Sequence, residues 1–391
     1  MCIRDRLTIN AGGTYTMSGG GLVAGDVINN GSFVYSGGAV QLTDGDLAVD
    51  NTGLLGDMVN IGYGQTFGSV NQTIGVASNG VITQTGGSNI VENNLTVAAD
   101  GVYNLGGNWN CNSCSKSYLN IRESINGSYT YGSMNVAGQV NQSGAIATLN
   151  DLTINVGGVY AQSSGRNSVR TSLNIELGGS YNLSGGELIV ADIINDGSFN
   201  FTGGTLDLGR NLSIAADGLL GGVVNISSGK HLIVNGLDEI TIDNTSTLNL
   251  NGGYITASTI NNNGNFNFTS GNLRLSSDLT IGAGGLLGDN LVLSSSKVLD
   301  VNGTAMVNSG RTLSVSGYEN EFTSLINNGT VDVSAGRLNV SSVTNTATVI
   351  IANNATMAED HRSSGYVPMN SYVQDDGTTT IDGTLITESF V

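Results

Sequence analysis

The sequence is poor in proline, in charge and above all in lysine. Its 391 residues include 1 Pro, and charged residues make up 11% of them, against about 25% in an average soluble domain. Proline removes a backbone donor, so its near absence is typical of strands paired on both sides. Lysine occurs only at Lys116, Lys230 and Lys297, within a net charge of −18. Without a basic stripe to neutralise phosphates, we expect no nucleic-acid partner.

Several other signals are missing. No apolar run approaches the roughly 20 residues of a membrane-spanning helix, and good helix formers are scarce. The chain carries no phosphate-binding loop and no serine nucleophile elbow. The calcium-loaded β-roll repeat is also absent, and scattered Asp residues do not make a ligand set. We therefore expect no cofactor and no metal.

Glycine, asparagine and alternating apolar residues dominate instead. The 58 Gly favour turns, while the Val, Ile, Thr, Leu and Phe between them favour strands. Apolar residues at 39% of the chain, placed in strict alternation, argue against disorder. The direct interpretation is an all-β chain with very frequent turns.

A repeat organises these strands. Residues 179–226 and 246–293 align without a gap at an offset of 67, with 21 of 48 positions identical, and residues 28–61 form an earlier copy with one residue inserted. Each copy holds three apolar pairs, in which one polar residue separates the two apolar ones. The pairs are Phe33/Tyr35, Val40/Leu42 and Leu47/Val49, then Phe199/Phe201, Leu206/Leu208 and Leu212/Ile214, then Phe266/Phe268, Leu273/Leu275 and Leu279/Ile281.

Each pair predicts a short strand with one buried face. Three such strands with tight corners trace one roughly triangular coil, so the sequence predicts a right-handed parallel β-helix, or β-solenoid, with about three short strands per coil. Glycine pairs such as Gly185-Gly186 and Gly252-Gly253 suit the corners. Asn30, Asn195, Asn263 and Asn328 are expected there in left-handed conformations, stacked in hydrogen-bonded ladders.

The ends of the chain suggest a fragment. The first six residues, MCIRDR, match the translation of a transposon-end tag used in sequencing libraries, and residue 7 enters a repeat at once. We therefore expect residues 1–6 to be non-native and 7–391 to form one solenoid with both ends truncated. Excursion loops are expected at 106–117, 163–172 and 357–377. Uncapped strand edges at the ends would favour end-to-end self-association.

Two cysteines lie close together in the loop at 106–117. Cys111 and Cys114 lack the two further ligands of a zinc site, and no helix pattern follows them as in a redox motif. A small disulfide in an oxidising compartment is the interpretation we favour over a metal half-site or a redox pair.

The repeats GGTYTMSGG (12–20), GSYNLSGG (179–186) and GSFNFTGGTLDL (197–208) carry a family likeness. They resemble the passenger regions of autotransporters and filamentous-haemagglutinin-like bacterial surface adhesins over nearly all of residues 7–391. The resemblance implies export, a β-helical stalk at the cell surface or outer membrane, and a role in adhesion or matrix formation. It also implies contact with surface glycans or matrix of a host or neighbouring cell.

Enzyme chemistry is the main alternative, because β-helical polysaccharide lyases and glycosidases use carboxylates on one outer face. The candidate acid pairs are Asp44/Asp46 and Asp375/Asp376, the second of them sharing a loop region with His361 and Arg362. Arg166 and Arg170 could hold an acidic sugar. Acids at corners normally cap the backbone, and polar loops are usually solvated, so we expect a non-catalytic exported surface protein. A polysaccharide-active enzyme or a carbohydrate-binding module is the alternative.

Overall fold

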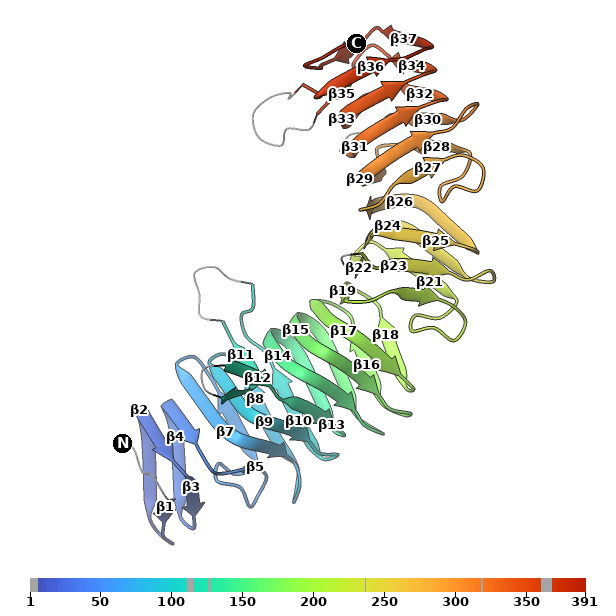
Figure 1. The fold of residues 1–391 in the computed structure, drawn as a ribbon. Helices are drawn as coiled ribbons and strands as arrows, with labels where there is room; N and C mark the ends of the chain where they lie inside the picture. Colours follow the sequence, from blue (N-terminus) through green and yellow to red (C-terminus); the bar gives the residue numbers. More distant parts are fainter. Residues whose placement is uncertain (1–5, 111–115, 126–127, 236, 318, 360–367) are drawn as a thin grey trace. The chain divides into compact units, whose positions relative to one another are not determined.

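The computed structural model describes residues 6–110, 116–125, 128–235, 237–317, 319–359 and 368–391. Within these ranges the secondary structure is all strand, and Figure 1 shows the strands stacked in parallel coils. The predicted all-β solenoid fold is confirmed. Two compact units divide the chain, Met1–Asp207 and Leu208–Val391, and each is itself a stack of such coils.

The strands of the first unit are β1 (Arg6–Ile9), β2 (Thr14–Ala24), β3 (Asp26–Asn29), β4 (Ser32–Leu42), β5 (Leu47–Val49), β6 (Met58–Ile61), β7 (Gln65–Ile74), β8 (Gly80–Gln84), β9 (Ser88–Val97), β10 (Gly101–Leu105), β11 (Tyr118–Ile125), β12 (Ser128–Tyr131), β13 (Ser133–Val136), β14 (Gln139–Ile154), β15 (Val159–Ile175), β16 (Ser180–Leu183), β17 (Glu187–Asn195), β18 (Ser198–Phe201) and β19 (Gly204–Leu208).

The strands of the second unit are β20 (Leu212–Ile214), β21 (Val223–Ser227), β22 (Lys230–Val234), β23 (Glu239–Ile242), β24 (Thr247–Ala257), β25 (Thr259–Asn262), β26 (Asn265–Leu275), β27 (Leu279–Ile281), β28 (Asn290–Leu293), β29 (Lys297–Val307), β30 (Thr312–Val315), β31 (Asn320–Asn327), β32 (Thr330–Val333), β33 (Gly336–Asn345), β34 (Thr348–Ile351), β35 (Ala355–Ala358), β36 (Ser371–Gln374), β37 (Thr378–Ile381) and β38 (Thr384–Leu385).

Each coil presents three faces. In the second unit, β30, β32 and β34 stack in register on the first face, with Thr312 opposite Thr330 and Thr330 opposite Thr348. The long strand β31 pairs with β33 on both of the other faces, Phe322 opposite Val340 and Leu325 opposite Val343. A register shift in β29 between Val301 and Thr304 lies at the corner between these two faces. Three strand segments per coil are therefore confirmed, although two of them often run on as one bent strand.

Burial follows the predicted inward pairs, with one difference. The second and third pairs of every copy are 4% exposed or less. The first, aromatic pairs are only partly covered: Phe199 and Phe268 are each 9% exposed, and Phe33, Tyr35, Phe201 and Phe266 are half-buried. The expectation that all three pairs are fully interior was therefore too strong for the first face.

The interior of the first unit combines stacked aromatic rings with buried glutamines, Gln142 and Gln162. Tyr160 stacks on Tyr181 at 4.9 Å between ring centroids, and Tyr181 stacks on Phe199 at 5.7 Å. Behind the rings, the Tyr181 hydroxyl donates to Gln162 Oε1 at 2.6 Å and the Tyr160 hydroxyl to Gln142 Oε1 at 2.8 Å. Sequence alternation predicted that Phe199 points inward, whereas nothing in it distinguished the buried glutamines from surface ones.

Asparagine ladders form, but not at the predicted corners. Asn267 Nδ2 donates to Asn249 Oδ1 at 2.8 Å and Asn249 Nδ2 to Asn225 Oδ1 at 2.9 Å, along the outer side of the first face. The described non-glycine residues with positive φ are Ala145, Glu319 and Asn354. The left-handed assignment of Asn30, Asn195, Asn263 and Asn328 was therefore wrong. The glycines that follow them, Gly31, Gly197, Gly264 and Gly329, do not have positive φ either; they allow the backbone of the preceding coil to approach closely.

The excursions differ from the expected ones. Residues 163–172, expected to form a loop, lie within β15, which pairs with β14 and β17. Their serines and arginines alternate outward, and this polar outer face has the composition of a loop. The hairpin of β11 and β12, an antiparallel pair, was not predicted. Irregular connections occupy the described part of 106–117. The described part of 357–377 is largely strand instead, because β35 continues to Ala358 and β36 covers Ser371–Gln374.

Gly165 provides a sharp test of corner geometry. Its φ is +81°, and a Cβ built on it would lie 2.1 Å from Gly144 O. Gly165→Ala should therefore lower the free energy of unfolding by about 2–4 kcal/mol, from left-handed strain and overpacking together. Gly19→Ala is the matched control, since its Cβ meets nothing within 4 Å. Equal denaturation midpoints for the two variants would contradict this account of the corner.

Candidate functional site

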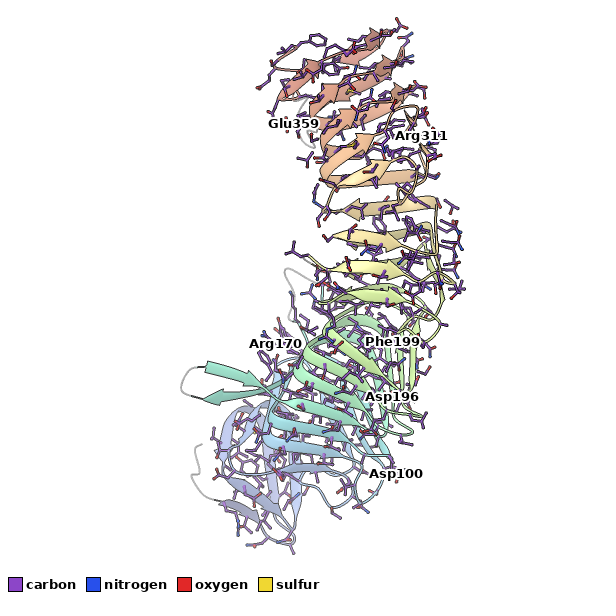
Figure 2. The ribbon with its side chains drawn as sticks, turned by 45° about the vertical axis from the view of Figure 1, so that its right-hand side comes forward. Asp100, Arg170, Asp196, Phe199, Arg311 and Glu359 are labelled. Atoms are coloured by element: carbon purple, nitrogen blue, oxygen red, sulfur yellow. The ribbon has the colours of Figure 1, made fainter. Side chains whose placement is uncertain are left out.

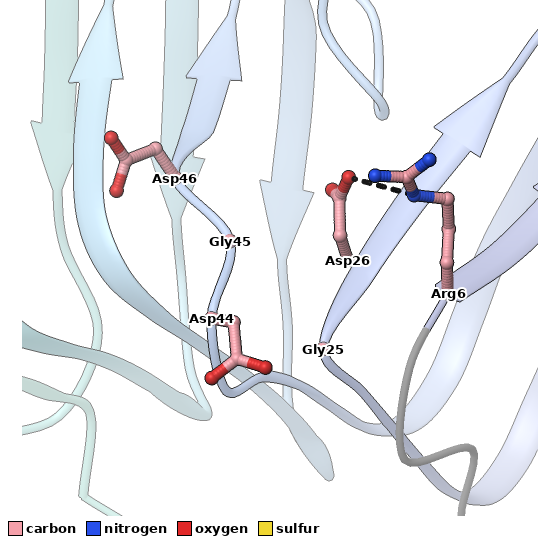
Figure 3. Close-up of a pocket in the computed structure, with 6 residues that line it drawn as sticks. All are labelled: Arg6, Gly25, Asp26, Asp44, Gly45 and Asp46. Atoms are coloured by element: carbon pink, nitrogen blue, oxygen red, sulfur yellow. Dashed lines mark ion pairs between the residues drawn. The ribbon is translucent and has the colours of Figure 1, made fainter.

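The acid pair Asp44/Asp46 lies at a corner of the first unit, in a hollow of about 690 Å³ that Arg6 and Asp26 also line. Figure 3 shows the two carboxylates pointing apart on either side of Gly45. Asp46 accepts a hydrogen bond from Asn71 Nδ2 at 2.8 Å, and Arg6 Nε pairs with Asp26 at 3.7 Å. The two carboxylates therefore do not converge on a common point, as acid and base of a glycosidase would.

The second acid pair caps a corner near the end of the second unit. Asp375 N donates to Asn345 O at 2.9 Å, and Asp376 Oδ1 accepts from Gly377 N at 2.7 Å. His361 and Arg362 lie outside the described residues. The Asp376 carboxylate thus accepts from the backbone of its own turn, a common role of aspartate, while the bond from Asp375 is made by its backbone.

The basic candidates each have a partner. Arg166 Nε contacts Glu187 Oε2 at 2.6 Å, across to the next coil. The Arg170 guanidinium, labelled in Figure 2, lies 3.9 Å from the centroid of the Tyr131 ring, and its Nη2 donates to the Tyr131 hydroxyl at 3.0 Å. The ring comes from the hairpin that sequence analysis missed. Both arginines are thus engaged in joining neighbouring elements, which argues against a shared anion site.

The remaining candidates fall in or beside the loop at 106–117. Cys111 and Cys114 lie outside the described residues. Trp109 Nε1 donates to Ser164 Oγ at 3.1 Å, so the indole covers β15. Over the described ranges no three His, Cys, Asp or Glu side chains gather as a metal ion would need. Those ranges also hold no helix of the length and apolarity that a membrane span requires.

A feature that sequence analysis missed is an opening in the first face. In the second unit, the first half of β26 pairs with β24, and β28 pairs with β30. Within the described chain no strand pairing joins β26 to β28 on this face, although β26 and β27 pair with β29 on the other two. The loop Gly282–Asp289 leaves the coil here (Figure 1). The resulting hollow has a volume of about 560 Å³. We call it the copy-3 groove, because most of its residues belong to the third copy of the repeat, residues 246–293.

The walls of the copy-3 groove are two strand edges. Asn265 N donates back to Ser246 O at 3.0 Å, so alternation turns the backbone groups of Phe266 and Phe268 toward the groove. Ser316 N donates to Leu293 O at 2.8 Å, which leaves the backbone groups of Asn290 and Val292 facing it from the other side. The groove is thus bordered by backbone donors and acceptors on both sides.

Side chains give the groove a mixed lining. Phe266 and Leu287 are half-buried, and Val292 is 54% exposed. The Lys297 ammonium lies 5.5 Å from the centroid of the Phe268 ring. One cation therefore lies over an aromatic ring in the lining of an otherwise neutral groove.

The first copy of the repeat builds the same feature on a smaller scale. Its groove has a volume of about 210 Å³ and is lined by Phe33, Tyr35, Leu55, Met58, Val59 and Asn60. Asn29 Nδ2 donates to Leu54 O at 3.1 Å, and this bond ties the loop to the coil. The Tyr35 hydroxyl donates inward, to Gly38 O at 2.8 Å and Thr66 O at 3.0 Å. Lysine is replaced by Gln65 at the position aligned with Lys297.

The loop that opens each groove has a recognisable sequence. GLLGD recurs at 53–57 and 285–289, and Gly288 N donates to Gly285 O at 3.1 Å, as Gly56 N does to Gly53 O. A Cβ on Gly285 would lie 2.3 Å from Thr280 O, so the turn requires glycine. The recurring GLLG was visible in the sequence, and only its effect on strand pairing required coordinates.

The fold places the chain in the class of parallel β-solenoid proteins. Comparison with known protein families, with curated proteins and with solved structures found no match.

Proposed function

We propose that this chain is a non-catalytic segment of an exported bacterial surface protein, a stalk or adhesin-type solenoid. The proposal is supported chiefly by one acid of each candidate pair: the Asp46 carboxylate binds the Asn71 side-chain amide and the Asp376 carboxylate binds the Gly377 backbone amide. The repeat favours an extended scaffold, because each coil buries its apolar face only against its neighbours. A net charge of −18 favours a soluble, self-repelling object.

In this role the outer faces serve display and contact, with surface glycans or matrix as partners. Corner aspartates such as Asp100 and Asp196 are exposed (Figure 2), and they keep the coil surface acidic. The resemblance of the repeats to autotransporter passengers and filamentous-haemagglutinin-like adhesins supports an extracellular location at the cell surface.

A turnover assay separates this proposal from the enzymatic alternative. We expect no new reducing ends and no unsaturated products when the chain is incubated with a panel of acidic and neutral polysaccharides. Asp376→Asn should behave like the parent, because Asp376 caps a turn. Turnover that Asp376→Asn abolishes would show a β-helical lyase or glycosidase and would overturn the proposal. Glycan binding without turnover would support it.

A further inference from the structure

The copy-3 groove is a gap in an otherwise continuous parallel sheet. On the other two faces the same coils are hydrogen-bonded directly, Leu273 opposite Leu299 and Thr280 opposite Met306. On the first face the Gly282–Asp289 loop separates Asn265–Phe268 from β28, and no described hydrogen bond crosses between the two edges. A strand edge with free donors and acceptors is a template for another extended chain.

We propose that the copy-3 groove binds an extended peptide segment, which adds a strand between β26 and β28 and carries one acidic side chain toward Lys297. The backbone groups of Phe266, Phe268, Asn290 and Val292 would pair with the peptide backbone, and Phe266, Leu287 and Val292 would contact its apolar side chains. This is strand addition, in which main-chain bonds supply affinity and alternate side-chain contacts supply selectivity.

Three observations favour a peptide over other occupants. The open groups alternate along two strand edges, which is the spacing of a polypeptide backbone. A sugar would need an exposed ring face, whereas Phe268 is 9% exposed and already has the Lys297 ammonium over it. A second copy of this chain would bring another net charge of −18, and like charge opposes such association.

Lys297 gives the copy-3 groove its positive charge. It is one of three lysines in the chain, and Lys230 holds the aligned position in the preceding copy, 67 residues earlier. A lysine stem covering an aromatic ring is common in itself. Together with open strand edges and a volume within the roughly 300–1,000 Å³ of ligand sites, it defines a pocket for an apolar strand with a single carboxylate. This binding would exist whether or not the chain serves as a stalk.

The test uses the full chain and a fluorescein-labelled heptapeptide of alternating threonine and valine with a central aspartate. We expect saturable binding by fluorescence anisotropy. Methylating the alternate backbone nitrogens of the peptide should weaken binding by about tenfold or more, because each methyl removes a donor. Equal binding of the methylated and unmethylated peptides would overturn the proposal, and this comparison uses the unaltered protein. So would binding of neutral oligosaccharides in place of the peptide.

Two protein variants locate the site. Val292→Pro removes a groove-facing donor, while the ladder to β30 depends on Leu291 and Leu293, so the strand should survive and peptide binding should fall about tenfold. Asn60→Pro is the matched control in the smaller first-copy groove and should leave binding unchanged. If Val292→Pro binds like the parent, or Asn60→Pro abolishes binding, the copy-3 groove is not the site.

Lys297→Met tests the acidic preference while keeping an apolar stem over Phe268. It should reduce the affinity for the aspartate peptide severalfold and leave an asparagine version of the same peptide unaffected. A loss that is equal for both peptides would contradict a carboxylate contact with Lys297. The circular dichroism spectrum and melting temperature of each variant establish that the solenoid is intact.

Discussion

Replacing Tyr181 with alanine should lower the free energy of unfolding of the first unit by about 3–5 kcal/mol, as for other large buried aromatics. Tyr181 is fully buried and stacks between Tyr160 and Phe199. Its hydroxyl donates to Gln162 Oε1 at 2.6 Å and accepts from Asn167 Nδ2 at 3.1 Å. Truncation therefore removes ring packing on both sides and also leaves two buried amides short of a partner.

Two further variants separate these contributions. Tyr181→Phe keeps the stack and removes the hydroxyl, so it should cost about 1–3 kcal/mol for the orphaned amide groups. Tyr254→Ala removes a tyrosine that is 46% exposed and should change stability by no more than about 0.5 kcal/mol. Urea denaturation followed by circular dichroism measures all three. A Tyr181→Ala midpoint equal to that of Tyr254→Ala would refute the interior stack.

Alternation identified most of the fold because a solenoid coil has few other determinants. Residues such as Leu206, Leu273 and Ile281 point inward by period two alone, and the stacking of coils follows from their repetition. The buried glutamines were not predicted, for the same reason. Gln142 and Gln162 occupy inward positions, but a glutamine in the sequence gives no sign that it is buried. Each glutamine accepts from a tyrosine of the neighbouring coil and donates to backbone carbonyls, Gln142 to Arg166 O and Gln162 to Glu187 O.

The two grooves and the β11–β12 hairpin could not be predicted from the sequence. Whether two first-face strands pair depends on where the connecting loop runs, and Gly282–Asp289 differs from an ordinary corner only in length and in its glycines. The segment 163–172 was predicted to be a loop but is part of a strand paired on both sides. Arg166 and Arg170 point outward from this strand. Outward composition reports solvent exposure, which loops and strand faces share.

Alkaline pH should destabilise the first unit steeply, because it buries several neutral tyrosines. Burial raises the pKa of Tyr35 to about 12, and burial likewise raises the pKa of Tyr103, Tyr160 and Tyr181 well above its ordinary value. An unfolded tyrosine titrates near pH 10. Below that pH both states keep the proton and stability is at its full value. Above it the unfolded chain loses protons that the folded chain retains, so stability falls until the folded pKa is passed.

The expected slope is large. The slope for each of the three fully buried tyrosines approaches about 1.4 kcal/mol per pH unit well above pH 10. An unfolded tyrosine is only half ionised at pH 10, so together the three should remove about 3 kcal/mol between pH 10 and pH 11. Urea midpoints measured across this range, with tyrosinate absorbance followed in parallel, test the linkage. Tyr181→Phe removes one titrating group and should reduce the slope by about a quarter to a third, since Tyr35 contributes beside the three fully buried tyrosines. A slope insensitive to Tyr181→Phe would place the destabilising ionisation elsewhere.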